Sequence, residues 1–151
     1  TKFLNRMKIS DIYKLIIDRF NLSLNDDEQK RFKSLLPELL KRVQVYTDLE
    51  IEFDWLFQKD FFCKDKNYQL KLQKYNLMLK EIGSRLKECE WNKENIKNTL
   101  NQYILDKSLT FKDIGPILRI ALTGKTNSPD LVSIIYELGC TITVNRLNYK
   151  Y

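Results

Sequence analysis

Residues suited to binding chemistry gather between Leu118 and Leu131, where a short polar loop joins two apolar runs. The segment carries the guanidinium of Arg119, the ammonium of Lys125 and the hydroxyl of Ser128. A guanidinium can make two parallel hydrogen bonds to a phosphate or a base edge, and exposed N–H and hydroxyl groups can bond the Watson–Crick edge of an unstacked base. An RNA loop is therefore the ligand that these residue types and their spacing suit.

A purely structural role also fits these residues. An arginine within an apolar helix usually covers the core with its stem and pairs with a carboxylate, and Ser128-Pro129-Asp130 is an ordinary helix start. Arg42 fits a solvated basic face at the end of a helix, where the helix dipole favours a cation. On residue types alone, the structural role is favoured for both Arg119 and Arg42.

Side chains for catalysis are scarce. The chain has no histidine, so it lacks the side chain most used for acid–base work near neutral pH, which is also the commonest metal ligand. It contains only four glycines and no glycine-rich phosphate-binding pattern. Asp26 and Asp27, with Glu28, resemble the acidic first turn of a helix rather than a catalytic dyad. We expect no catalytic residue, metal site or cofactor in this chain.

Composition indicates a soluble protein of a reducing compartment. Cys63, Cys89 and Cys140 lie far apart and form neither a zinc pattern nor a disulfide framework. The 151 residues are 43% hydrophobic, enough for one domain or two small helical subdomains. The net charge of +6 favours a polyanionic partner. Because no apolar run approaches the roughly 20 residues of a membrane span and no secretory signal is present, we expect a cytoplasmic protein without membrane contact.

Apolar residues recur at helical spacing through nearly the whole chain, which predicts an all-α fold. Asn92, Thr110 and Ser128 are candidate N-caps, and Gly124 and Gly139 candidate helix ends. The expected helices cover about 10–20, 26–43 with a kink or break near Pro37, 68–86 as one long helix, 93–104, 111–123, 129–138 and 141–147. An aromatic cluster is expected to form the core of the first half. Its members are Tyr46, Phe53, Trp55, Phe57, Phe61 and Phe62.

The polar loop also carries a family motif. Leu118-Arg119-Ile120-Ala121-Leu122-Thr123-Gly124, three further residues and Ser128-Pro129-Asp130-Leu131 resemble the L-R-x-A-L-T-G-x-x-x-[ST]-P-x-L motif of glutamyl-tRNA synthetases, which are class I aminoacyl-tRNA synthetases. Supporting matches are Trp91 before a helix, Leu138-Gly139, Arg146-Leu147, and Arg42 fifteen residues before Phe57. The resemblance implies the C-terminal anticodon-binding part of a bacterial enzyme, an all-helical cage of two subdomains covering residues 1–90 and 91–151.

The resemblance also implies a role for individual residues. Arg42 would read the third anticodon base, Arg119 and Ser128-Pro129 the middle base, and the backbone of Leu131 would lie at the first base. A register shift would place Gln44 in the position of Arg42. In this family arginine at that position is associated with glutamate tRNA alone, and glutamine with glutamine tRNA as well. No base contact is expected in the tail at residues 140–143.

The ATP-binding H-I-G-H and K-M-S-K-S signatures of the family are absent from the chain. The resemblance therefore implies that the catalytic domain, with its ATP and magnesium, lies upstream, and that this part alone is not an enzyme, although its parent would be a glutamate–tRNA ligase. The implied partners are the anticodon loop of glutamate tRNA and the catalytic domain of the same chain, and we expect a monomer. Two alternatives stay open: a helical protein-interaction module with a solvated basic face, and a helical domain that binds a small molecule.

Overall fold

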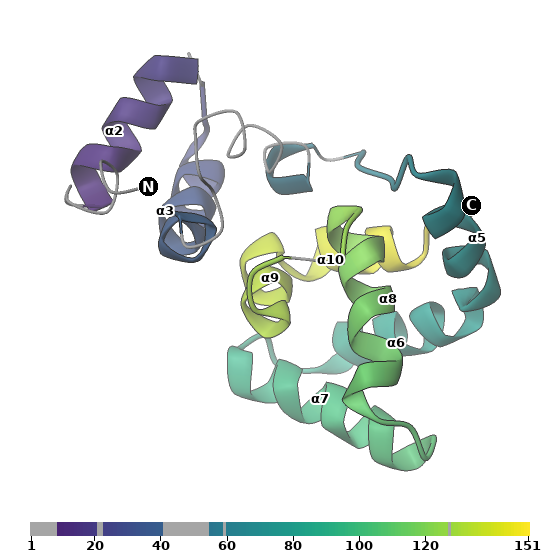
Figure 1. Cartoon of the computed structure of the whole chain (residues 1–151). Coiled ribbons are helices and arrows are strands. Elements are labelled where there is room, and N and C mark those ends of the chain that lie inside the picture. The colour runs from purple at the N-terminus through teal and green to yellow at the C-terminus, as the bar shows by residue number, and fades with distance from the viewer. Residues whose placement is uncertain (1–8, 21–22, 41–54, 59, 127) are drawn as a thin grey trace. The chain divides into compact units, whose positions relative to one another are not determined.

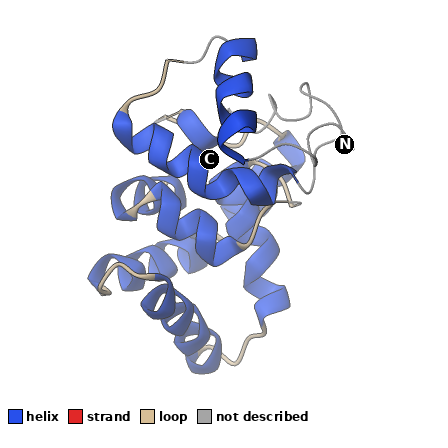
Figure 2. Cartoon of the chain, turned by 90° about the vertical axis from the view of Figure 1, so that its left-hand side faces the viewer, coloured by secondary structure: helices blue, strands red, loops and turns tan. Residues whose placement is uncertain are grey.

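The computed structural model describes residues 9–20, 23–40, 55–58, 60–126 and 128–151. The chain forms two compact units, Thr1–Gln58 and Lys59–Tyr151, each of which is described by itself. Every regular element in the described ranges is a helix (Figures 1 and 2). The predicted all-α class is confirmed. No helix in these ranges is long and apolar enough to cross a membrane.

The first unit is built on α2 (Ile9–Phe20) and α3 (Asp26–Leu40), which pack against each other. Asn25 and Glu28 cap α3 reciprocally, since the Glu28 N–H donates to Asn25 Oδ1 at 2.8 Å and the Asn25 N–H donates to Glu28 Oε1 at 3.1 Å. The acidic residues at 26–28 thus serve as a first-turn cap, as predicted. The apolar stripes of both helices are buried and include Ile12, Ile16, Phe32, Leu35, Leu36 and Leu39.

Helix α3 runs through Pro37 without the predicted break. A proline inside a helix removes one backbone hydrogen bond, but Leu36 and Leu39 on either side are fully buried, and this packing holds the helix together. The predicted extension of the helix beyond residue 40 lies outside the described residues.

The aromatic cluster does not form one core. Trp55 is buried in the first unit, where the Phe57 ring meets the Phe32 ring edge-on with centroids 5.6 Å apart. Phe61 is buried in the second unit, whereas Phe62 is 36% exposed and stacks on Tyr149. Sequence proximity therefore misled the prediction, because the boundary between the two units passes through the cluster. Tyr46 and Phe53 lie outside the described residues.

The second unit contains α5 (Lys66–Lys74), α6 (Asn76–Glu88), α7 (Lys93–Asp106), α8 (Phe111–Thr123), α9 (Leu131–Leu138) and α10 (Cys140–Leu147). Helix α10 packs most extensively against α6 and also contacts α8 and α9, while α7 lies against α6 and α9 (Figure 1). The last helix is therefore central to this core. The predicted boundary at residues 90 and 91 falls inside the unit, because α6 packs on α10 and the Trp91 indole N–H donates to the Tyr136 carbonyl at 3.2 Å.

The predicted long helix over residues 68–86 is two helices. Tyr75 leaves helical geometry at φ −104° and ψ 18°, although its N–H still donates to the Lys71 carbonyl. Helix α5 packs on α8, whereas α6 packs on α10 and α7, so the chain changes partners at this residue. The apolar repeat continues across the junction and gives no local signal of the break.

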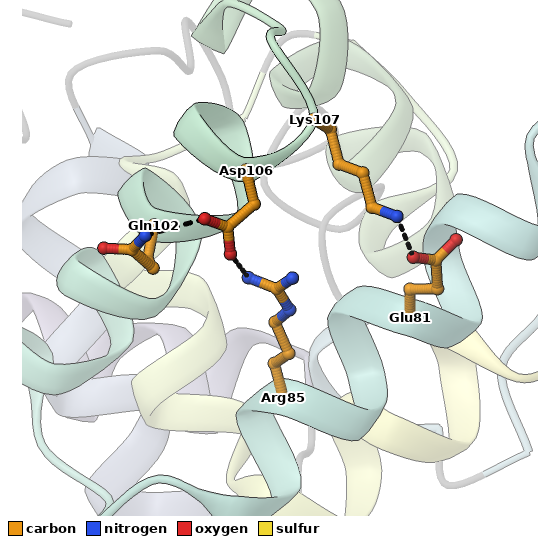
Figure 3. A network of polar contacts seen from close by, with 5 residues as sticks. All are labelled: Glu81, Arg85, Gln102, Asp106 and Lys107. Atoms are coloured by element: carbon orange, nitrogen blue, oxygen red, sulfur yellow. Dashed lines mark hydrogen bonds and ion pairs between the residues drawn. The ribbon is translucent and has the colours of Figure 1, made fainter.

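A polar network joins α6 to the C-terminal end of α7 (Figure 3). Asp106 accepts from Arg85 at 2.7 Å and from Gln102 at 2.8 Å, and Lys107 pairs with Glu81 at 2.9 Å. The hydrogen bond from Gln102 and that from Arg85 lower the pKa of Asp106, and the bond to Glu81 raises the pKa of Lys107. These groups are exposed and satisfied within the fold, which indicates a structural role for the network.

Candidate nucleic-acid interface

The ends of α8 are set by local chemistry. At the start, the Thr110 N–H and hydroxyl donate to one Asp113 carboxylate oxygen at 2.7 and 3.0 Å. At the end, Gly124 adopts a left-handed φ of +78° and its N–H donates to the Ile120 carbonyl at 2.8 Å. Both the predicted cap and the predicted glycine stop are confirmed. Between these two points α8 holds Arg119 on a rigid support.

Arg119 is half-buried on α8, and its guanidinium leans toward the N-terminal end of that helix. Its Nη1 atom lies 3.5 Å from the position that a Cβ on Gly115 would occupy, one helical turn before Arg119. Among the described residues, none forms an ion pair or hydrogen bond with this guanidinium. The structural alternative, in which Arg119 pairs with a carboxylate, therefore finds no support in the described part of the chain. Its donors are available to a ligand.

The loop after α8 is fastened by Thr123, a residue that sequence reasoning did not single out. Its buried hydroxyl lies 2.7 Å from the Arg119 carbonyl and 3.0 Å from the Lys125 carbonyl, and it accepts from the Lys125 N–H at 3.3 Å. One hydroxyl thus connects the last turn of α8 to the first loop residues. A threonine at the end of an apolar helix, next to a glycine stop, was the available signal.

Ser128 is not the N-cap of α9, contrary to the prediction. Asp130 fills that position, since its carboxylate accepts from the Ser133 N–H and hydroxyl, each at 3.1 Å, and α9 begins at Leu131. The Asp130 side chain makes these two bonds to Ser133, whereas the buried Ser128 hydroxyl lies at the Pro129 carbonyl, so the helix begins two residues later than predicted. A cap at Asp130 also places the carboxylate against the positive end of the helix dipole.

Three of the predicted contact residues are buried in this structure. Ser128 is 3% exposed and Leu131 1%, and Pro129 is buried as well. Within the described residues, the Ser128 hydroxyl contacts the Pro129 carbonyl at 3.4 Å. These residues therefore shape the loop, while the half-buried Arg119 and Lys125 and the exposed Thr126 and Asp130 are the more accessible polar residues of the segment. Arg42, like Gln44, lies outside the described residues.

Arg146 on α10 holds the C-terminal end of α8 in place. It is 3% exposed, its Nη1 donates to the Leu122 carbonyl at 2.6 Å, and its guanidinium carbon lies 4.7 Å from the centroid of the Phe61 ring. The same ring comes within 3.2 Å of the position of a Cβ on Gly124. A cation at the C-terminal end of α8 is favoured by the helix dipole. The sequence places Arg146 in the motif of the last helix but does not reveal its burial.

A pocket of about 540 Å³ opens between α7 and the starts of α8 and α9. Its lining includes Lys93, Lys97, Leu100, Asn101, Phe111 and Asp130. Since Phe111 and Gly115 precede Arg119 by two turns and one turn of the same helix, the pocket adjoins the surface that carries the free guanidinium.

Comparisons with known proteins agree with this arrangement. A family described as "Anticodon binding domain" matches residues 9–150. Glutamate–tRNA ligase 1 of Bartonella henselae is 33% identical over 126 residues, covering 81% of this chain and 26% of that protein. The glutamate–tRNA ligase of Buchnera aphidicola is 30% identical over 146 residues, covering 91% of this chain and 31% of that protein. The chain thus spans between a quarter and a third of the length of these relatives.

A solved glutamate tRNA ligase from Elizabethkingia meningosepticum has the same fold over 97% of this chain and 30% of its own, with a TM-score of 0.75 at 20% identity. The glutamate-tRNA synthetase of Elizabethkingia anophelis aligns over 97% of this chain and 29% of its own, with a TM-score of 0.72 at 18% identity. These two structures establish the shared helical architecture.

Proposed function

Because this chain belongs to the anticodon-binding domain family and is homologous to part of glutamate–tRNA ligases, we propose that it binds and reads the anticodon loop of glutamate tRNA. The observation that carries the proposal is the Arg119 guanidinium, which is accessible and has no protein partner among the described residues. It lies on a helix whose two ends are fixed by capping and by Arg146.

Recognition follows from what the guanidinium can do. Arg119 presents planar, paired donors, so it can bond two acceptors on one base edge. Thr123 and Arg146 fix the last turn of α8, which limits the conformational entropy that the helix carrying Arg119 loses when RNA binds. Lysines on α7 and in the loop would contact phosphates and position the RNA without reading its sequence.

The buried serine implies an adjustment on binding. For the Ser128 hydroxyl to contact the middle base, as the family resemblance implies, the loop at 125–130 must open, since Ser128 is 3% exposed. The backbone at 128–131 could instead contribute carbonyl and N–H groups. We propose that Arg119 makes the first contact with the base and that the loop rearranges afterwards.

Catalysis is proposed for a different part of the parent protein. The relatives are ligases of which this chain matches at most a third, and the chain has no histidine. We propose that the ATP- and magnesium-dependent ligation of glutamate takes place in a catalytic domain outside residues 1–151, in a monomeric cytoplasmic enzyme. The present chain would then contribute tRNA selection alone.

The decisive experiment is a titration of the chain with glutamate tRNA and with a copy that carries a substituted middle anticodon base, both at the same low salt concentration. We expect the substituted RNA to bind about 10-fold more weakly, because a wrong base leaves a polar contact unpaired at a cost of about 1–3 kcal/mol. Equal affinity would contradict anticodon reading and favour the protein-interaction alternative.

A further inference from the structure

An exposed aromatic ring lies directly beside the free guanidinium. Phe111, Gly115 and Arg119 follow one another at intervals of four along α8 and share one face. A Cβ on Gly115 would come within 3.0 Å of Phe111 Cε1 and 3.5 Å of Arg119 Nη1. The missing side chain at Gly115 therefore leaves room for both groups, and the ring and the guanidinium lie next to this buried glycine.

The ring is not used by the protein core. Phe111 is 43% exposed at the first residue of α8, whereas Ile114, Gly115 and Leu118 in the following turns are buried. An exposed aromatic ring offers a flat apolar face on which a planar ligand can stack, and a neighbouring guanidinium adds hydrogen-bond donors. A planar ligand can therefore stack on the exposed ring of Phe111.

The pocket next to Phe111 has the chemistry of a site for a base and its phosphate. Leu100 gives it an apolar floor with 1% exposure, Asn101 adds an amide, and Lys93 and Lys97 stand one helical turn apart. Its volume of about 540 Å³ lies within the range of about 300–1,000 Å³ that is usual for ligand sites. The lining of this pocket thus combines apolar, amide and ammonium groups.

The formal charges in this pocket are balanced, because Glu94 and Asp130 line it together with Lys93 and Lys97. The Asp130 carboxylate is engaged by the Ser133 N–H and hydroxyl, and Glu94 lies in the first turn of α7, where it complements the helix dipole. Lys93 contacts the Tyr136 ring at 5.7 Å, and no described carboxylate pairs with Lys97. The lysines are therefore available to a phosphate.

We propose that Phe111 is a stacking platform for one unpaired nucleobase of the bound RNA, with the adjoining pocket receiving that nucleotide and Lys97 contacting its phosphate. This inference rests on the proposed function. Stacking on an aromatic side chain is tolerant of base identity, so Phe111 supplies affinity, whereas Arg119 beside it supplies discrimination. The two contributions are separable by mutation.

The test uses Phe111→Leu, Phe111→Trp and Lys97→Ala in the 151-residue chain, titrated with glutamate tRNA and with the copy substituted at the middle anticodon base. We expect Phe111→Leu to weaken binding of both RNAs by about 10-fold, because one stacked base is lost. Phe111→Trp keeps an aromatic ring and should bind both RNAs as tightly as the unaltered chain does. The ratio of the two affinities should stay unchanged in both Phe111 variants, because Arg119 is intact.

Salt dependence and base fluorescence separate stacking from charge. Lys97→Ala should reduce the slope of log affinity against log salt by about 0.7, the value for one phosphate of a single strand, while Phe111→Leu should leave the slope unchanged. A set of RNAs, each with the fluorescent base 2-aminopurine at a different single position of the anticodon loop, identifies the stacked base. We expect the unaltered chain to quench the fluorescence at one of these positions and Phe111→Leu to leave it unquenched.

Gly115→Ala, which pushes the Phe111 ring aside while adding a better helix former, should weaken RNA binding without lowering the melting temperature of the chain.

The outcomes distinguish the two proposals. Affinities of Phe111→Leu within twofold of those of the unaltered chain, with discrimination between the two RNAs retained, would overturn the platform and leave the proposed function intact. An unaltered chain that binds both RNAs equally would overturn anticodon reading, and the affinity of Phe111→Leu would still decide the platform. An unaltered chain that binds neither RNA would overturn both.

Discussion

The guanidinium of Arg146 on α10 donates a 2.6 Å hydrogen bond to the backbone carbonyl of Leu122 in the last turn of α8. A charged side chain with 3% exposure thereby satisfies one of the carbonyl groups that a helix leaves free at its C-terminal end. Because Leu122 is followed by Thr123 and Gly124, this bond fixes the point from which the polar loop departs.

Replacing Arg146 with Met should destabilise the second unit. Methionine keeps the length of the stem but cannot donate to the buried Leu122 carbonyl, so we expect the free energy of unfolding to fall by about 1–3 kcal/mol. Urea unfolding of this variant and of Lys87→Met, an exposed control on α6, measures the effect. An unchanged or higher stability of Arg146→Met would mean that the cost of burying the guanidinium exceeds the value of its hydrogen bond.

Removing the free guanidinium should affect RNA binding and leave folding unchanged. We expect Arg119→Ala to lose the preference for glutamate tRNA over the copy with a substituted middle base, because no described residue depends on the Arg119 side chain for a hydrogen bond. Lys87→Ala removes one positive charge elsewhere on the same unit and should keep the preference. Full discrimination by Arg119→Ala would place the reading of the middle base elsewhere.

Specificity at the third base is predicted to depend on Arg42. We expect Arg42→Gln to relax the preference at that base and to leave the preference at the middle base intact, since the family resemblance links arginine there to glutamate tRNA alone. Titration with four RNAs that differ only at the third anticodon base measures the profile. If the profile of Arg42→Gln matches that of the unaltered chain, a Gln44→Arg variant tests the shifted register.

Alkaline pH should destabilise the second unit through Tyr151. Burial raises the pKa of Tyr151 to about 12, and its hydroxyl oxygen accepts from the Cys63 N–H at 2.7 Å. Since the folded pKa lies above the unfolded value of about 10, the stabilisation is complete below about pH 10 and is lost as pH rises toward 12. Urea unfolding at about pH 9 and 11.5 should show a smaller loss for Tyr151→Phe than for the unaltered chain. Equal losses would assign the effect to other groups, such as Tyr103, whose pKa burial also raises.

The parts of the fold that depend on neighbouring residues could be predicted from the sequence. Asn92 caps α7 by accepting from the Asn95 N–H at 2.8 Å, and Gly124 ends α8 in the left-handed region, because both features require only the local residue type. The break at Tyr75 and the split of the aromatic cluster depend on which distant helix each segment meets, and no local pattern carries that information.

The same distinction applies to the candidate site. The motif identified the segment that holds Arg119, and the structure adds that its guanidinium points back along α8 toward Gly115 rather than into the loop. The burial of Ser128 and Arg146 could not be predicted, since it follows from packing between α8, α9 and α10. A motif therefore locates the contact residues but not the surface that they share.

Because α10 is the last helix of the second unit and packs against α6, α8 and α9, the core of this unit cannot be completed early in synthesis. The principal partner of α10, helix α6, leaves the ribosome more than fifty residues earlier. The hydrogen bond from the Cys63 N–H to the Tyr151 hydroxyl likewise joins residues that are 88 positions apart. Until the final helix emerges, α6 and α8 expose apolar surface that nothing else covers, and contacts between such distant segments form slowly. Nascent chains of this unit should therefore depend on chaperones until α10 has emerged from the ribosome.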